Sequence, residues 1–147
     1  MKVEIDFDSK GMERRLREIS MQLPGNIRKA LNVTALYGSN IITDRTKKGL
    51  GYRGGFAPYS SGYAKFRKKK GRQINTVDFN FSGKMLASIT AKSTGNNTAM
   101  IYFVSAAESK KAAMLNIKRP WFGFNNGEQK KIRKFFYKSL TSKAVIG

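Results

Sequence analysis

GLGYRGGFAPYSSGYAKFRKKKGRQINTVDFNFSG, residues 49–83, separates two halves of this chain whose patterns are largely helical. Glycines interrupt the stretch repeatedly, and a row of aromatic side chains runs through its first half. Connections between elements usually span about 4–6 residues, so a stretch of 35 residues is long for a passive loop. The sequence therefore predicts a long extended arm over 49–83, with one helical turn at about 63–70.

Before the arm, the hydrophobic pattern predicts one strand and two helices. Residues 2–8 alternate apolar and polar side chains, as a half-buried strand does. Residues 12–22 repeat apolar side chains at the spacing of a short amphipathic helix. The next helix begins at Pro24, which is favoured in a first turn, and runs to about residue 46, with Gly49 as its C-cap.

After the arm, the pattern predicts a hairpin and two more helices. Residues 86–93 and 98–105 flank a Gly/Asn turn, and the second strand has apolar side chains on both faces, which indicates a central strand. Residues 106–116 have the composition of a short helix. The last helix begins at Asn125 or Asn126, either of which can cap it.

These elements predict an α+β fold. A long N-terminal helix and a C-terminal helix would pack on a small antiparallel sheet of about four strands, counting residues 76–81, which alternate as residues 2–8 do. A length of 147 residues fits one domain, 1–147, in which the arm 49–83 stands out. Residues 142–147 are expected to form a frayed tail.

The composition is unfavourable for catalysis. Cysteine and histidine are absent, which removes thiolates, the commonest general base and the commonest metal ligand. Only nine acidic residues occur, five of them within the first 18 positions. We therefore expect no enzyme activity, no catalytic or metal site, and no cofactor.

The charge points to anionic partners. The net charge is +20, and the arm alone carries seven cations against one acidic residue. Six of those cations are concentrated in one run: Lys65, Arg67, Lys68, Lys69, Lys70 and Arg72. The run could contact a polyanion such as DNA or an acidic protein surface. Equally, it could be a solvated loop that mutual repulsion keeps extended.

The aromatic row of the arm has two interpretations as well. Its side chains could stack on nucleic-acid bases, or they could anchor the arm to its own core or to a neighbouring subunit. The sequence favours anchors, because no nucleic-acid recognition motif accompanies the row. The candidate contact residues are Tyr52, Phe56, Pro58, Tyr59, Tyr63 and Phe66. A second aromatic group around Trp121 is interpreted as core.

Three short steps occur in a fixed order along the chain. The first is F-A-P-Y-S at 56–60, the second is S-G-K-M-L-A-S-I at 82–89, and the third is R-P-W-F-G at 119–123. Their order resembles that of the tailed-phage virion morphogenesis proteins, the tail-completion or neck proteins of the head–tail junction. That family tends to show W-x-P-L-S, T-G-x-L-x-x-S-I and R-P-F-L-G. Phe56 replaces the family's tryptophan, and its histidine-containing step after the hairpin is absent.

The resemblance implies a small α+β protein without catalysis that forms a homo-oligomeric ring, a hexamer. It also implies contacts with a portal-side adaptor or head-completion protein, and with a tail tube or tail terminator protein. The location implied is the head–tail junction of the virion, reached from the host cytoplasm during assembly. In such a ring the arm could lie across the next subunit, with DNA nearby.

Two further expectations follow from the residues themselves. No apolar run approaches the roughly 18 residues of a membrane helix, and the N-terminus does not look like a signal peptide, so no membrane partner is expected. The alternative to an assembly protein is a basic nucleic-acid-binding protein that grips phosphates with residues 65–72.

Overall fold

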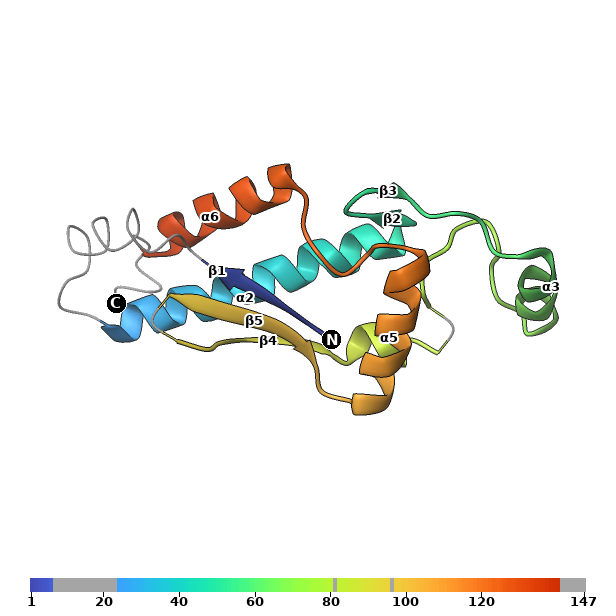
Figure 1. The fold of residues 1–147 in the computed structure, drawn as a ribbon, viewed down its shortest axis with the longest axis horizontal. Helices are drawn as coiled ribbons and strands as arrows, with labels where there is room; N and C mark the ends of the chain where they lie inside the picture. The colour runs from blue at the N-terminus through green and yellow to red at the C-terminus, as the bar shows by residue number, and fades with distance from the viewer. Residues whose placement is uncertain (7–23, 81, 96, 141–147) are drawn as a thin grey trace. The chain divides into compact units, whose positions relative to one another are not determined.

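A computed structural model describes the fold of most of the chain (Figure 1). The described residues are 1–6, 24–80, 82–95 and 97–140. The expected helix at 12–22 and the expected tail at 142–147 lie outside these residues. Contacts between residues divide the chain into two compact units, and both units take residues from several separate segments.

We name the two units by what they contain. The arm unit consists of Met1, 41–89 and 103–125. The described part of the sheet unit consists of 2–6, 24–40, 90–95, 97–102 and 126–140. Helix α2 (Pro24–Lys47) contributes to both, because the division falls between its residues 40 and 41.

The sheet unit contains most of a three-stranded sheet in the order β1-β5-β4, formed by β1 (Lys2–Asp6), β5 (Thr98–Phe103) and β4 (Ile89–Ser93). The end residues Ile89 and Phe103 belong to the arm unit. Strands β1 and β5 are antiparallel, in a register that runs from Lys2 opposite Tyr102 to Asp6 opposite Thr98. The prediction that 98–105 forms the central strand is confirmed for β5. Its apolar residues on both strand faces, including the fully buried Ile101, explain that position.

Two helices complete the sheet unit. The buried side of α2 includes Ala30, Leu31 and Ala35, which occur at helical spacing. Helix α6 (Asn126–Leu140) buries an apolar stripe, and its Phe135 ring stacks on Tyr37 of α2 with ring centroids 4.2 Å apart. These helices confirm the predicted long N-terminal helix and closing C-terminal helix, and the α+β class with them.

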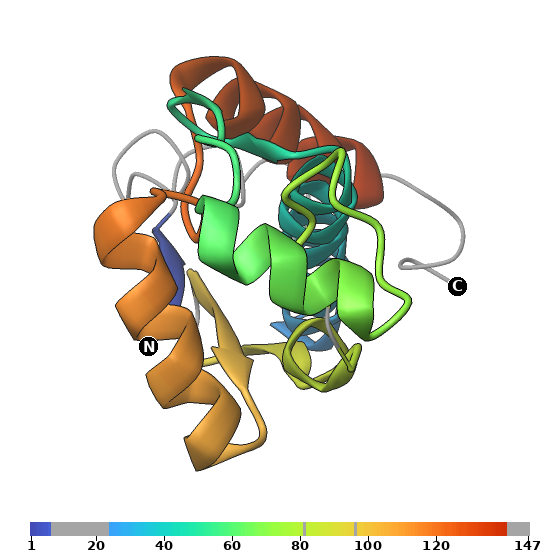
Figure 2. The same cartoon turned by 90° about the vertical axis from the view of Figure 1, so that its right-hand side faces the viewer.

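The arm unit contains short elements joined by irregular chain (Figure 2). They are β2 (Leu50–Gly51), β3 (Gly54–Gly55), α3 (Ser61–Lys69), α4 (Lys84–Ala87) and α5 (Ala106–Lys118). Gly49 follows the end of α2 with φ +79°, and its N–H donates to the Thr46 carbonyl at 2.9 Å. Glycine adopts this left-handed conformation without a side-chain clash, which is why it ends the helix here.

Two local predictions for the arm differ from the structure. The single helical turn at 63–70 is a helix of nine residues, α3, whose first turn is capped by Ser60 Oγ accepting from the Tyr63 N–H at 3.3 Å. The strand-like alternation at 76–81 gives no strand over the described residues 76–80. There Asp78 Oδ1 accepts from the Asn80 N–H, and Phe79 has φ +56°, a turn that breaks an extended conformation.

Candidate functional site

An aromatic cluster forms the core of the arm unit. Trp121 is fully buried, and the Phe79 and Phe103 rings meet it edge-on at centroid distances of 5.2 and 6.2 Å. Phe56 extends this group by stacking on Phe79, with the ring centroids 4.8 Å apart. The indole N–H of Trp121 donates to the Ala112 carbonyl of α5 at 3.3 Å. The arm is therefore joined to α5 through aromatic packing within its own chain, in agreement with the core interpretation of the Trp121 group.

Arg119 connects the third sequence step to the first. Its guanidinium donates to the Ala57 carbonyl at 3.2 Å and to the Pro58 carbonyl at 3.1 Å. Nearby, the backbones of Gly51 and Pro120 lie so close that a β-carbon on Gly51 would stand 2.0 Å from the Pro120 carbonyl oxygen. The first and third sequence steps, which lie far apart in the sequence, are thus joined by hydrogen bonds from the Arg119 side chain to backbone carbonyls.

Arg67 folds the arm back on itself. The side chain is 2% exposed, and it donates from Nε to the Gln73 carbonyl at 3.0 Å and from Nη2 to the Asn80 carbonyl at 3.3 Å. Its guanidinium also lies 3.7 Å from the Asp78 carboxylate and 4.6 Å from the centre of the Tyr59 ring. The basic run predicts that Arg67 contacts a polyanion or an acidic partner. In the structure its side chain is buried and holds the loop that follows α3.

Tyr59 completes this arrangement. Its hydroxyl lies 3.4 Å from both the carboxylate oxygen and the backbone nitrogen of Asp78, so it can donate to the first and accept from the second. Partial burial raises the pKa of the Tyr59 phenol above its usual value. The neutral phenol is therefore the form that the folded arm favours.

Arg45 uses the same mode of binding at the end of α2. Its Nη2 donates to the Trp121 carbonyl at 2.6 Å and to the Gly123 carbonyl at 2.9 Å. Three arginines of the arm unit, Arg45, Arg67 and Arg119, thus each donate to two backbone carbonyls. Their planar guanidinium groups suit this double donation, which a lysine ammonium cannot reproduce with the same geometry.

The predicted aromatic contacts separate into two groups. Phe56 is half-buried on Phe79, Tyr59 is half-buried beside Arg67, and Tyr52 is half-buried with its ring against Gly123. These rings anchor the arm to its own unit, one of the two anchor roles that the sequence left open. The remaining predicted contacts are exposed side chains, namely Pro58, Tyr63 and Phe66.

The predicted cationic contacts divide in a similar way. Arg67 is buried, whereas the other cations of the run are exposed. These are Lys65, Lys68, Lys69, Lys70 and Arg72. They lie on α3 and in the turn after it, which gives this helix a strongly basic outer surface.

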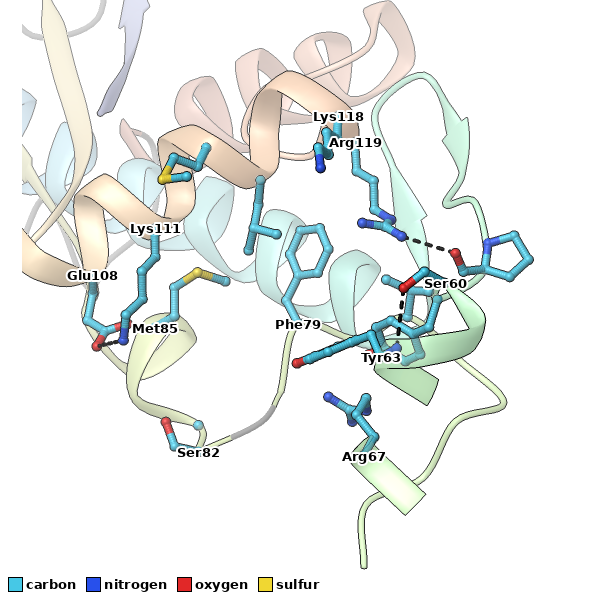
Figure 3. A pocket seen from close by; sticks show the side chains of 16 residues that line it. Ser60, Tyr63, Arg67, Phe79, Ser82, Met85, Glu108, Lys111, Lys118 and Arg119 are labelled. Atoms are coloured by element: carbon cyan, nitrogen blue, oxygen red, sulfur yellow. Dashed lines mark hydrogen bonds and ion pairs between the residues drawn. The ribbon is translucent and has the colours of Figure 1, made fainter. Parts of the chain in front are cut away.

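A cleft of about 680 Å³ lies within the arm unit, between α5 on one side and α3 with residues 77–80 and 82–85 on the other (Figure 3). The lining is largely apolar or aromatic, from Tyr59, Tyr63, Val77, Phe79, Met85, Met114 and Leu115. Lys111, Lys118 and Arg119 of α5 and its end also line it. Its one lining acid, Glu108, forms an ion pair with Lys111 at 3.1 Å.

The sequence does not reveal this cleft. Residues 106–116 have the composition of a short helix, but the wall that α5 supplies depends on tertiary packing against the arm. One signal was present: Met114 follows Lys110 and Lys111 by one turn, which places apolar and basic side chains on one helix surface. Met114 is 71% exposed, which is high for such a large apolar side chain.

Comparison with models of protein families, with curated proteins and with solved structures gave no match. Among the described residues, no group of three or more acidic, histidine or cysteine side chains could hold a metal ion. The described helices include none that is both long and apolar enough to cross a membrane.

Proposed function

We propose that this chain is a structural protein of a tailed bacteriophage, a neck or tail-completion component. Copies of it would form a homo-oligomeric ring, a hexamer, that joins the head connector to the tail without catalysing a reaction. The partners would be a portal-side adaptor on one side and a tail tube or terminator protein on the other. The chain would act in the virion after assembly in the host cytoplasm.

The contact of Arg119 with Ala57 and Pro58 is the main support for this proposal. It joins the R-P-W-F-G step directly to the F-A-P-Y-S step through two hydrogen bonds. The S-G-K-M-L-A-S-I step contributes Met85 and Leu86 to the buried residues of the same unit. The three steps that resemble the phage family therefore belong to one packed structure, as expected if they were inherited together from a common ancestor.

The test of this proposal is the size of the full-length protein in solution, measured by light scattering with and without duplex DNA. We expect symmetric self-association in the absence of DNA. Phe66 is 45% exposed on α3 and is a suitable contact for a neighbouring subunit, so Phe66→Ser should shift the protein towards monomers. Leu36→Ser removes a similarly exposed apolar side chain from α2 and should leave the assembly unchanged.

A point variant is a sharper test than removal of the arm. Deleting residues 54–72 would also delete Phe56 and Arg67, which the arm unit needs for its own packing. A monomeric wild-type protein that binds duplex DNA tightly at moderate salt would overturn the ring proposal. Intact rings of the Phe66→Ser variant would show that α3 is not the contact between subunits.

The exposed cations on α3 support nucleic-acid binding as the second candidate. If they grip phosphates, the logarithm of the affinity for duplex DNA should fall steeply with the logarithm of the salt concentration. Replacing Lys65, Lys68 and Lys69 by alanine should then make that slope shallower by about 0.9 for each phosphate contact that is lost. In an assembly protein whose DNA affinity is secondary, the same triple variant should keep its oligomeric state.

A further inference from the structure

We propose that the cleft between α5 and the arm binds an acidic segment of another protein, one that inserts apolar side chains between α5 and α3. This inference deepens the proposed function. It rests on that function for one point, namely that the partner is an assembly component. The chemistry of the site itself is independent of that function.

The apolar lining of the cleft favours a peptide segment as the occupant. Figure 3 shows Phe79 directed into the space between α5 and α3. Met85 lies on one wall and is 7% exposed, whereas Met114 on the other wall is 71% exposed. Methionine side chains are flexible and adapt to different apolar shapes, a property common at surfaces that bind peptides. A volume of about 680 Å³ can accept a few inserted side chains.

The charge of the cleft favours an acidic segment. Lys118 and Arg119 line one end of it, while Lys111 and Glu108 pair with each other near Met85 at the other end (Figure 3). The pairing of its one lining acid leaves the surroundings of the apolar lining positive. A positive rim attracts acidic segments and increases their rate of association.

A second copy of this chain is a poorer occupant of the cleft than an acidic protein. Each copy has 29 lysine and arginine residues but only nine acidic ones, so it offers few acidic side chains to the positive rim of the cleft. Five of the nine acidic residues lie in the first 18 positions. The described acids among these belong to β1, where the strand pairs with β5 and Glu4 forms an ion pair with Lys2 at 3.2 Å. A different, acidic protein is the better match.

Nucleic acid is also a poorer match for the cleft than for α3. Phosphates are bound by cations arranged along an accessible surface, and the outer side of α3 offers such a row. The cleft instead places methionine, valine and leucine side chains where a backbone of phosphates would have to lie. The two surfaces have different residues, so they can be tested separately.

The experiment uses the full-length protein and a display library of random linear peptides, selected at physiological salt. We expect the enriched peptides to combine aspartate or glutamate with large apolar residues. The affinity of one synthesised, labelled member would then be measured by fluorescence polarisation. Met114→Glu and Lys118→Glu should each weaken the peptide affinity at least about tenfold. Both add negative charge beside the peptide, and they remove an apolar and a cationic contact, respectively.

Two matched variants control for general charge effects. Val104→Glu changes an apolar side chain that is 75% exposed and lies outside the cleft lining. Lys68→Glu makes the same charge change as Lys118→Glu, but on α3 and outside the cleft lining. Both should alter the peptide affinity by less than about threefold, because neither side chain lines the cleft and exposed charges are screened at physiological salt.

Several results would overturn the inference. They are a library that yields no binder, enriched peptides without acidic residues, and equal losses for Lys68→Glu and Lys118→Glu. Competition by a duplex oligonucleotide that depends on Met114 would show that the cleft belongs to a nucleic-acid surface instead.

Failure of this inference can be told apart from failure of the proposed function. A protein that forms rings in light scattering but selects no acidic peptide keeps its function and loses this site. A monomeric protein that binds acidic peptides through Met114 and Lys118 keeps the site and loses the ring.

Discussion

The sheet unit and the arm unit satisfy the hydrogen-bonding groups of their backbones by different means. In the sheet unit the polar backbone groups belong mostly to two helices and to the ladder of β1, β5 and β4. In the arm unit much of the chain is irregular, and arginine side chains donate to its carbonyls at three places. The difference shows that positive charge in this protein is partly structural, because the guanidinium groups replace regular secondary structure as hydrogen-bond donors.

The cations of the basic run in the arm do not all have the same role. Arg67 and Lys68 are neighbours in the sequence, but the first is buried and the second is exposed. A guanidinium can satisfy several carbonyls at once when it is buried, whereas lysine keeps its strongly hydrated ammonium in water. A count of cations therefore overstates the charge that the arm can present to a partner.

The largest expected effect comes from removing the arginine inside the arm. Arg67→Met should lower the free energy of unfolding of the arm unit by about 3 kcal/mol, because Asp78 and two loop carbonyls lose a buried donor. The change can be followed by urea denaturation with the fluorescence of Trp121, the single tryptophan of the chain, which lies in the arm unit. Lys68→Met, the matched control, should change it by less than about 0.5 kcal/mol. A loss below about 1 kcal/mol for Arg67→Met would contradict the structural role of this charge.

A smaller loss of stability is expected from a substitution where two backbone segments of the arm unit touch. Gly51→Ala should cost about 2 kcal/mol, because the new β-carbon would collide with the Pro120 carbonyl and force the backbones apart. Gly62→Ala is the control: nothing lies within 4 Å of its added β-carbon, and the residue is in α3. It should stabilise the protein by about 0.5–1 kcal/mol, as alanine does in helices. Equal effects of the two variants on Trp121 fluorescence in urea would show that the close approach is unimportant.

The smallest effect is expected in the sheet unit. The Asn32 side chain of α2 accepts a hydrogen bond from the Ser93 N–H of β4 at 2.7 Å. Asn32→Ala should lower the free energy of unfolding by about 1 kcal/mol, measured by thermal denaturation followed by circular dichroism. The neighbouring Lys29→Ala, an exposed position on α2, serves as the control. A loss as large as that of Arg67→Met would remove the contrast between the units.

The sequence by itself determined the elements whose residues repeat with a regular period. The elements predicted from the stripe of α2, the alternation of β1 and the apolar faces of β5 are confirmed in class and approximate position, and so is the start of α6 at Asn126. They can be predicted because helices and strands expose or bury side chains at fixed intervals.

Only the tertiary structure decided which arm residues are buried, where residues 76–80 turn, and that α5 forms a cleft with the arm. The local sequence does not distinguish the buried Arg67 from the exposed Arg72, because the burial of Arg67 depends on Asp78 and on carbonyls up to 13 residues away. Phe79 continues an alternating pattern, but it lies in a turn rather than a strand. From there its ring contacts Trp121, 42 positions later. The physical reason is that contacts between residues far apart in the sequence determine this burial and this turn. The local periodicity of the sequence contains no information about such contacts.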